Sequence, residues 1–314
     1  MDDRPFSQKL PADLEALISG VDEKPIRRRN DGPPSGDDLD LLPSPSVPMA
    51  VARAFIENRI CDGVPTLRHW RGGWWEWQQS HWREIEYRTV RATLYEFTEG
   101  AFYANDDGET KPWAPTRRKV GDLSEALAAI CHLADHTNQP SWLDGRKTGV
   151  IVACGNGLLD VERRQLTRHT PLFFNQAAVP FGYDPQARPP ERWLNFLTKL
   201  WPNEPPAINV LGEWFGYITS GRTDLHKILL MVGPTRGGKG VIARTLGALI
   251  GRENVAGPTL SSLGGEFGLA PLIGKPLAVI SDARFTGKNS NIVVERLLSI
   301  SGEDTLTVNI KYKE

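Results

Sequence analysis

The sequence predicts an α/β fold in which a domain built on a parallel sheet with flanking helices follows a mixed α+β domain and a helical bridge. The uninterrupted apolar run KILLMV (227–232) suits a buried parallel strand. The glycine-rich loop GPTRGGKG (233–240) comes next, and VIARTLGALIG (241–251) then has the apolar spacing of a helix. A second apolar run, PLAVISDAR (276–284), predicts another strand near the acid Asp282.

The bulk composition limits the class of protein. The chain of 314 residues has room for about two domains. A net charge of −1 excludes a globally basic nucleic-acid-binding protein, although a local basic patch stays open. No apolar run is long enough to cross a bilayer, and the N-terminal MDDRPFSQKL has no secretion signal. Cys61, Cys131 and Cys154 contain no CxxC pair, so we expect reduced thiols and a cytoplasmic protein without a membrane partner.

We expect four segments along the chain. They are a disordered tail and linker over 1–48, a mixed α+β domain over 49–187, a helical bridge over 188–225 and the loop-containing domain over 226–314. The first segment has a short helical pattern and is then rich in Pro, Gly, Ser and Asp without hydrophobic periodicity, which is typical of a linker. Its basic run at 27–29 favours a solvated tail over a nucleic-acid contact.

The second segment begins with a predicted helix at 51–60 and a predicted pair of strands within 66–85, joined by a turn at Gly72–Gly73. Five tryptophans crowd these strands: Trp70, Trp74, Trp75, Trp77 and Trp82. We expect alternate indoles to pack a small sheet. The alternative is a platform on which single-stranded bases stack.

Further elements connect this domain to the last one. A helix is predicted at 122–136, and two strands are predicted within 149–161 with a turn at Asn156–Gly157. The apolar spacing within 190–220 predicts two amphipathic helices, separated by the breaker PNEPP (202–206). These helices form the predicted bridge.

The glycine-rich loop matches the phosphate-binding pattern G-x-x-x-x-G-K-[ST] at Gly233, Gly238 and Lys239. In such a P-loop, backbone N–H groups hold the phosphates, the lysine reaches the β and γ oxygens, and the helix N-terminus adds partial positive charge. The bare pattern is weak, but its strand–loop–helix context indicates a nucleoside-triphosphate site and a P-loop NTPase domain. The predicted nucleotide-binding residues are Gly233, Pro234, Thr235, Arg236, Gly237, Gly238, Lys239, Gly240 and Val241.

The predicted magnesium site departs from the pattern. Gly240 stands where a P-loop has the Ser or Thr that ligates Mg²⁺, and Val241 brings no hydroxyl either. Asp282 has the spacing of a Walker-B carboxylate, which holds Mg²⁺ directly or through water. Because Mg²⁺ keeps several waters, one water can replace the missing hydroxyl. ATP and Mg²⁺ are therefore the predicted cofactors, with Lys239 and Asp282 as the catalytic residues.

An ordered set of segments carries a resemblance to a known family. The segments are NGLLDV (156–161), HTPLFF (169–174), PFGYDP (180–185), RWLNFLTKLWP (192–202), EWFGYITSGRTDLHKILLMVGP (213–234) and SISGEDTLTVNIKYKE (299–314). Together with the loop, they resemble the primase–helicase family of phages and plasmids, which joins a poxvirus NTPase-like N-terminal domain to a superfamily-3 helicase domain. The resemblance covers roughly residues 65 to 314.

The resemblance implies a DNA helicase of phage or plasmid replication that hydrolyses ATP and moves along single-stranded DNA, as a hexamer in the complete protein. It also implies a hairpin at 304–313 in which Lys311 and Lys313 face DNA phosphates; a solvated edge strand is the alternative for these lysines. The family's polar sensor and arginine finger would lie beyond Glu314, so we expect a helicase core truncated at its C-terminus.

Two roles stay open at this stage. Ala283 follows Asp282 where the family places a second acid, so the residue that orients the attacking water is unassigned among Glu266, Glu295 and Glu303. The sequence contains neither a D-x-D pair with a following histidine nor a zinc ribbon, either of which would indicate a primase site. Any primase is therefore expected to be a separate partner.

Two other functions remain alternatives. One is a remnant that binds ATP or partner subunits without turnover, which the single acid at the end of 276–284 favours. The other is a small-molecule P-loop kinase, since G-K-G occurs in nucleotide kinases. The tryptophan-rich domain upstream has no clear role in a kinase.

Overall fold

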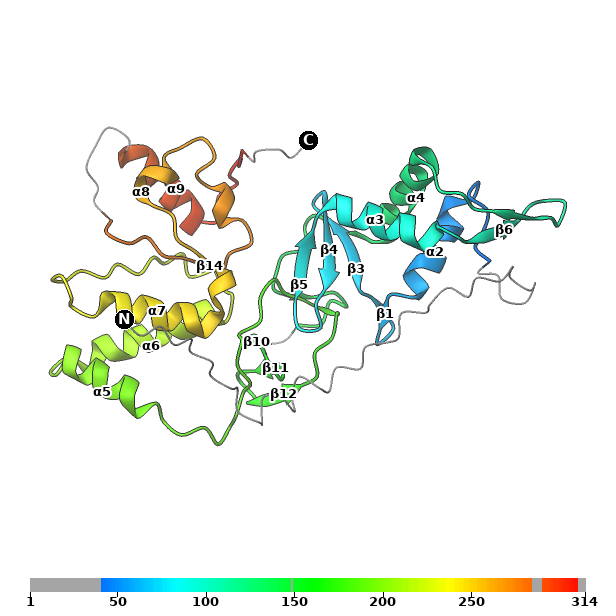
Figure 1. The fold of residues 1–314 in the computed structure, drawn as a ribbon. Coiled ribbons are helices and arrows are strands. Elements are labelled where there is room, and N and C mark those ends of the chain that lie inside the picture. Colours follow the sequence, from blue (N-terminus) through cyan, green and yellow to red (C-terminus); the bar gives the residue numbers. More distant parts are fainter. Residues whose placement is uncertain (1–40, 148, 284–289, 310–314) are drawn as a thin grey trace, which may run out of the picture. The chain divides into compact units, whose positions relative to one another are not determined.

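The computed structural model describes residues 41–147, 149–283 and 290–309 (Figure 1). These residues belong to one compact unit that begins at Leu41. The first 40 residues of the predicted tail lie outside the described part. Residues 41–47, the end of the predicted linker, contact the folded chain. The N–H of Leu42 donates to the carbonyl of Phe102 at 2.8 Å, and Trp113 Nε1 donates to the carbonyl of Pro43 at 3.3 Å.

Three helices enclose the first hydrophobic core: α2 (Pro48–Glu57), α3 (Tyr87–Thr98) and α4 (Arg117–Ile130) (Figure 1). Helix α3 buries Val90, Leu94 and Thr98, which recur every four residues and so share one face. Helix α4 begins after Thr116, whose side-chain oxygen accepts a hydrogen bond from the Lys119 N–H. The helix predicted at 122–136 therefore starts and ends earlier than expected, because this cap recruits the basic tract into the first turn.

The tryptophans build a mixed sheet in the order β5-β4-β3-β8. Strands β3 (Leu67–Trp70), β4 (Gly73–Trp77) and β5 (Trp82–Ile85) are antiparallel, and β8 (His132–Leu133) runs parallel to β3. The turn between β3 and β4 is Arg71–Gly72, one residue before the predicted one, with φ values of 49° and 74°.

Four of the five indoles are buried: Trp70, Trp74, Trp75 and Trp82. Trp74 belongs to the first core, and Trp77 packs against the cluster that contains the other three. Trp70 meets Phe174 edge to face, with ring centroids 5.1 Å apart. The packing interpretation is therefore confirmed for the buried four, whose faces are not open to bases.

The strands predicted within 149–161 are present as β10 (Ile151–Cys154) and β11 (Gly157–Asp160), and β12 (Gln165–Thr167) completes an antiparallel sheet. Gly157 is not in the turn, which is Gly155–Asn156, but in β11 with a φ of 153°. A β-carbon there would clash with the carbonyl oxygen of Thr167, so the close approach of β12 requires glycine. The remaining short pairs are β1 (Ile60–Cys61) with β2 (Val64–Pro65), β6 (Phe102–Ala104) with β7 (Thr110–Pro112), and β9 (Ser141–Trp142) with β13 (Phe173–Phe174).

The two helices predicted within 190–220 are present as α5 (Glu191–Leu200) and α6 (Pro205–Thr219), with the breaker PNEPP at their junction. Helix α7 (Lys239–Ile250) lies beside α6 (Figure 1). Leu197, Leu211 and Ile242, one from each helix, form a buried cluster. The bridge thus forms the surface on which the glycine loop and its helix rest.

The strand predicted at 227–232 is absent, and this prediction was wrong. The segment is extended, but among the described residues no strand pairs with it. Leu229 and Met231 pack toward the helical cluster, whereas Leu230 is 72% and Val232 86% exposed. Only one face of the segment is therefore covered. A strand also needs a hydrogen-bonded neighbour, and none of the described residues provides one.

Parallel pairing in this region is limited to β14 (Val255–Ala256) with β15 (Leu277–Ala278). The strand predicted at 276–284 is therefore much shorter than expected. The described chain is a mixed α/β structure with small sheets, and it does not show the extended parallel sheet that the sequence predicted.

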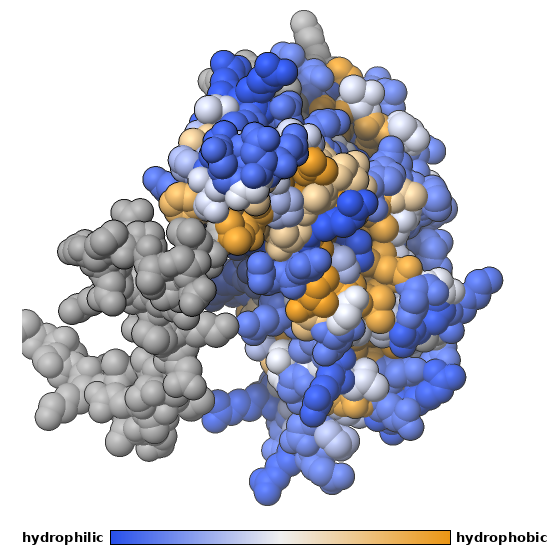
Figure 2. Space-filling model, turned by 90° about the vertical axis from the view of Figure 1, so that its right-hand side faces the viewer, coloured by the Kyte–Doolittle hydropathy of each residue, from blue (hydrophilic) through white to orange (hydrophobic). Residues whose placement is uncertain are grey.

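Short elements complete this part: η1 (Arg252–Asn254), α8 (Leu260–Leu263), η2 (Ala270–Leu272) and α9 (Ser290–Ser301). Leu263, Leu269 and Val293 form a buried cluster that joins α8, η2 and α9. The face of the molecule in Figure 2 is largely hydrophilic, with apolar patches between. Among the helices of the described residues, none combines the length and apolar character needed to cross a membrane.

Candidate nucleotide site

The glycine loop forms a tight turn before α7. The N–H of Gly237 donates to the carbonyl of Pro234 at 3.1 Å, and Arg236 between them has a φ of 62°. A β-carbon on Gly237 would lie 2.9 Å from the Pro234 carbonyl oxygen, so a side chain there would open the turn. This local chemistry fixes the course of the backbone around the site.

Gly238 joins the loop to the helix. It is the N-cap of α7 and has a φ of 82°, in the left-handed region that glycine enters without strain. Its carbonyl accepts hydrogen bonds from the N–H groups of Val241 and Ile242. The N–H groups of Lys239 and Gly240 have no preceding turn to donate to, since they belong to the first turn of the helix. They are available, with the positive end of the helix dipole, to an anion.

Lys239 is the first residue of α7, and its ammonium folds back over the loop. Its Nζ atom donates to the carbonyls of Gly233 and Pro234, at 2.8 Å each. These contacts hold the lysine ammonium beside the first two residues of the loop. The carbonyls are neutral acceptors, so a phosphate oxygen there would be the stronger partner for the ammonium.

Helix α5 supplies a wall of the site. Phe196 and Leu200 contact the place that a β-carbon on Gly238 would occupy, at 3.0 and 3.3 Å. The groove beside the loop is lined by Phe196, Lys199, Leu200, Arg236, Gly237, Gly238, Gly240, Val241 and Arg244. Three of these residues are cationic and none is acidic, so the groove favours an anion.

The structure does not bring Asp282 into contact with the loop. Beyond β15, the N–H of Val279 still donates to the carbonyl of Ala256 at 2.8 Å, and the chain then turns at Asp282, which is exposed with a φ of 51°. Within the described residues, no hydrogen bond or ion pair joins Asp282 to 233–241. No three His, Cys, Asp or Glu side chains of the described chain cluster as metal ligands.

The three glutamates left open as water-orienting residues lie in different places. Glu266 lines a shallow pocket with residues of the 255–275 region, and Glu295 is exposed on α9. Glu303 accepts a hydrogen bond from Thr223 Oγ1 and lies 3.7 Å from His226 Nε2. None of the three lines the groove beside the loop. Lys311 and Lys313, the predicted DNA contacts, lie outside the described residues.

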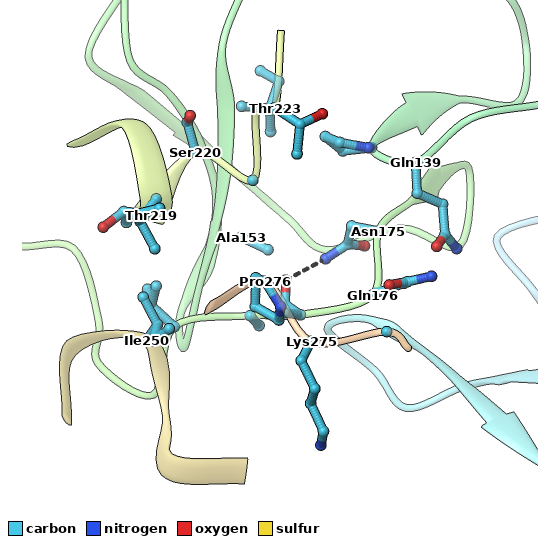
Figure 3. Close-up of a pocket in the computed structure, with 18 of the residues that line it drawn as sticks. Gln139, Ala153, Asn175, Gln176, Thr219, Ser220, Thr223, Ile250, Lys275 and Pro276 are labelled. Atoms are coloured by element: carbon cyan, nitrogen blue, oxygen red, sulfur yellow. Dashed lines mark hydrogen bonds between the residues drawn. The ribbon is translucent and has the colours of Figure 1, made fainter. Parts of the chain in front are cut away.

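A second pocket, of about 230 Å³, lies apart from the loop (Figure 3). Its polar lining includes Gln139, Asn175, Gln176, Thr219, Ser220 and Thr223, and none of residues 233–241 lines it. Asn175 is buried and its Nδ2 donates to the carbonyl of Ala177 at 2.9 Å. Ile250, at the last turn of α7, lines this pocket, so the length of the helix, roughly 18 Å, separates it from the loop.

Sequence reasoning missed the contributions of Phe196, Lys199 and Arg244 to the groove. The amphipathic pattern of α5 predicted a helix but not the element against which it packs. The position of Arg244 could have been predicted from the sequence, since Arg244 lies four residues after Gly240 and so on the same face of the predicted helix.

Comparisons with known proteins agree with the order of these elements. Residues 66–202 match a family model described as D5 N terminal like, and residues 231–314 match a family of unknown function, DUF5906. A search of curated proteins found no match. The chain therefore carries a D5 N-terminal-like domain followed by a DUF5906 domain, the combination typical of phage and plasmid primase–helicase proteins.

Proposed function

We propose that the chain binds ATP at residues 233–241 and hydrolyses it as the helicase component of phage or plasmid DNA replication. The observation that carries this proposal is the loop-to-helix junction: Gly238 in a left-handed conformation, Lys239 at the first helical position, and its ammonium held over the loop by Gly233. Free backbone donors at a helix N-terminus, with a lysine at the first helical position, form an anion site suited to phosphates.

Each residue has a role in this proposal. The backbone of 233–241 cradles the phosphates, and Lys239 neutralises the β and γ oxygens. Asp282 is the residue of this chain that would hold Mg²⁺, directly or through water, because it is the first carboxylate after β15. When bound, the ion would neutralise charge on the phosphates.

The domain order supports a motor rather than a small-molecule kinase. A D5 N-terminal-like domain precedes the loop-containing domain, and that arrangement links the chain to D5-like NTPases. We propose single-stranded DNA as the polymer, with Lys311 and Lys313 as phosphate contacts, a hexameric ring and a separate primase partner. Phosphate contacts by lysine are independent of sequence, as translocation requires.

The position of Asp282 also supports a second candidate function, nucleotide binding without hydrolysis. An exposed acid without contact to the loop is also what a chain that binds nucleotide without turnover would have. In that case ATP would act as a structural or regulatory ligand.

Equilibrium binding of ATP to the purified chain tests the proposal, with Lys239→Ala beside Lys111→Ala as the matched control on β7. Lys239→Ala should weaken binding by about tenfold or more, since charge-assisted contacts to phosphate are lost. Lys111→Ala should bind as the parent chain does. Equal affinities for all three proteins would overturn the nucleotide site. Phosphate transfer to a nucleoside monophosphate would instead establish a kinase.

A further inference from the structure

We propose that Arg244 binds the phosphates of the nucleotide and takes over part of the role of the missing hydroxyl ligand at Gly240. This inference rests on the proposed function, because it assigns a further phosphate-binding residue to the same loop. It predicts a nucleotide site whose affinity depends only weakly on Mg²⁺.

The geometry places the guanidinium beside Gly240. Arg244 follows Gly240 by one helical turn, and side chains in a helix lean toward its N-terminus. The Nη1 atom of Arg244 lies 3.1 Å from the position that a β-carbon on Gly240 would occupy, and Cζ lies 3.8 Å from it. The arginine therefore reaches the space in which a Ser or Thr side chain would begin.

The charge of Arg244 is not used by another described residue. Within the described chain, Arg244 has no ion pair or side-chain hydrogen bond. It lines the groove with Lys199 and Arg236, and this groove has no acidic lining residue. A guanidinium presents several N–H donors in a plane and binds phosphate oxygens in pairs, which makes it well suited to this position.

Glycine at position 240 leaves room for the guanidinium of Arg244 beside the first turn of α7. The β-carbon of a Ser or Thr at 240 would lie 3.1 Å from Nη1 of Arg244, so the guanidinium would have to shift by a few tenths of an ångström. With glycine, the guanidinium stays over the first turn and supplies positive charge where a P-loop with Ser or Thr depends on a metal ion. Lys239 remains a further cation, with its ammonium hydrogen-bonded to the carbonyl of Gly233.

ATP binding is measured by equilibrium dialysis in Mg²⁺ and in EDTA, for the parent chain, Arg244→Ala, Gly240→Ser and the double variant. Removing Mg²⁺ should weaken binding to the parent chain by less than about tenfold. Arg244→Ala should lose about tenfold or more in EDTA and less in Mg²⁺. The double variant should regain affinity in Mg²⁺ only, because its serine restores a metal ligand.

Arg252→Ala is the matched control, since Arg252 is exposed just after the other end of α7. It should bind as the parent chain does in both buffers. Thermal unfolding of each variant checks the fold, and Arg244 is exposed, so its removal should leave the melting temperature unchanged.

Two results separate the inference from the proposal beneath it. If Lys239→Ala abolishes binding and Arg244→Ala matches the parent chain in EDTA, the role of Arg244 is overturned while the nucleotide site stands. If Lys239→Ala also binds normally, the nucleotide site itself is wrong, and the role of Arg244 falls with it.

Discussion

Phe196 closes one side of the glycine loop, because its Cζ atom lies 3.0 Å from the position that a β-carbon on Gly238 would occupy. Gly238 also has a φ of 82°, which strains any other residue. Two independent requirements, one conformational and one steric, therefore demand glycine where the loop becomes a helix. The bridge helix α5 thus shapes the site as well as supporting it.

Gly238→Ala should lower the free energy of unfolding by about 1 to 2 kcal/mol, from the left-handed backbone alone. It should also weaken ATP binding, because Phe196 or the loop must shift. Urea denaturation and nucleotide titration measure the two effects. Gly212→Ala in α6 has open space at the corresponding position and should be neutral or stabilising by up to about 1 kcal/mol. Equal losses for both substitutions would argue against the steric account.

Trp82→Ala should cost about 3 to 5 kcal/mol of unfolding free energy, because the side chain is fully buried and a cavity would remain. Its indole also donates to the carbonyl of Pro171 at 3.2 Å. Tyr87→Ala, at a 48% exposed site on α3, should cost well under half as much. A Trp82→Ala chain of normal stability that no longer binds single-stranded DNA would support a base-stacking platform instead.

The stability of the chain should fall as the pH drops below about 6.5, the usual pKa of histidine. Burial lowers the pKa of His69, His81 and His169, and the charge of Arg83 lowers the pKa of His81 further. Because the folded-state pKa of each side chain lies below its unfolded value, the unfolded chain binds more protons as the pH falls through about 6.5, and this binding stabilises the unfolded state.

Melting temperatures at about pH 7.5 and about pH 5.5 check this dependence. His169→Gln should reduce the drop between the two, since one proton-binding difference is removed. His136→Gln changes an exposed histidine and should leave the drop as it is. A drop that is identical in all three proteins would exclude His169 as a contributor.

Much of the helical structure could be predicted from the sequence. The spacing of Leu197 and Leu211 and the breaker between them predicted α5 and α6, because helix periodicity is a local property. The indoles were also placed correctly in a sheet, because the alternation of side chains along a strand is likewise a local property. Turn positions at Arg71–Gly72 and Gly155–Asn156 were missed by one residue, since hairpin register depends on the pairing of both strands.

The predicted parallel sheet failed for a different reason. An apolar run such as 227–232 indicates burial, but a strand forms only where a neighbour supplies backbone hydrogen bonds, and sequence spacing does not reveal the neighbour. The junction between the glycine loop and the following helix is present as the sequence predicted, because Gly238 and Lys239 define it locally. The contributions of Phe196 and Arg244 depend on packing and on side-chain direction, and so required the structure.

ATP hydrolysis by the purified chain, with and without single-stranded DNA, tests the central claim most directly. The parent chain should turn over ATP faster when DNA is added, and both Lys239→Ala and Asp282→Ala should lose that turnover by about a hundredfold or more, as expected when phosphate or metal contacts in phosphoryl transfer are removed. Lys239→Ala should lose nucleotide binding as well. Turnover that survives in Lys239→Ala, or a parent chain that binds ATP but never hydrolyses it with DNA present, would contradict the assignment of a helicase motor.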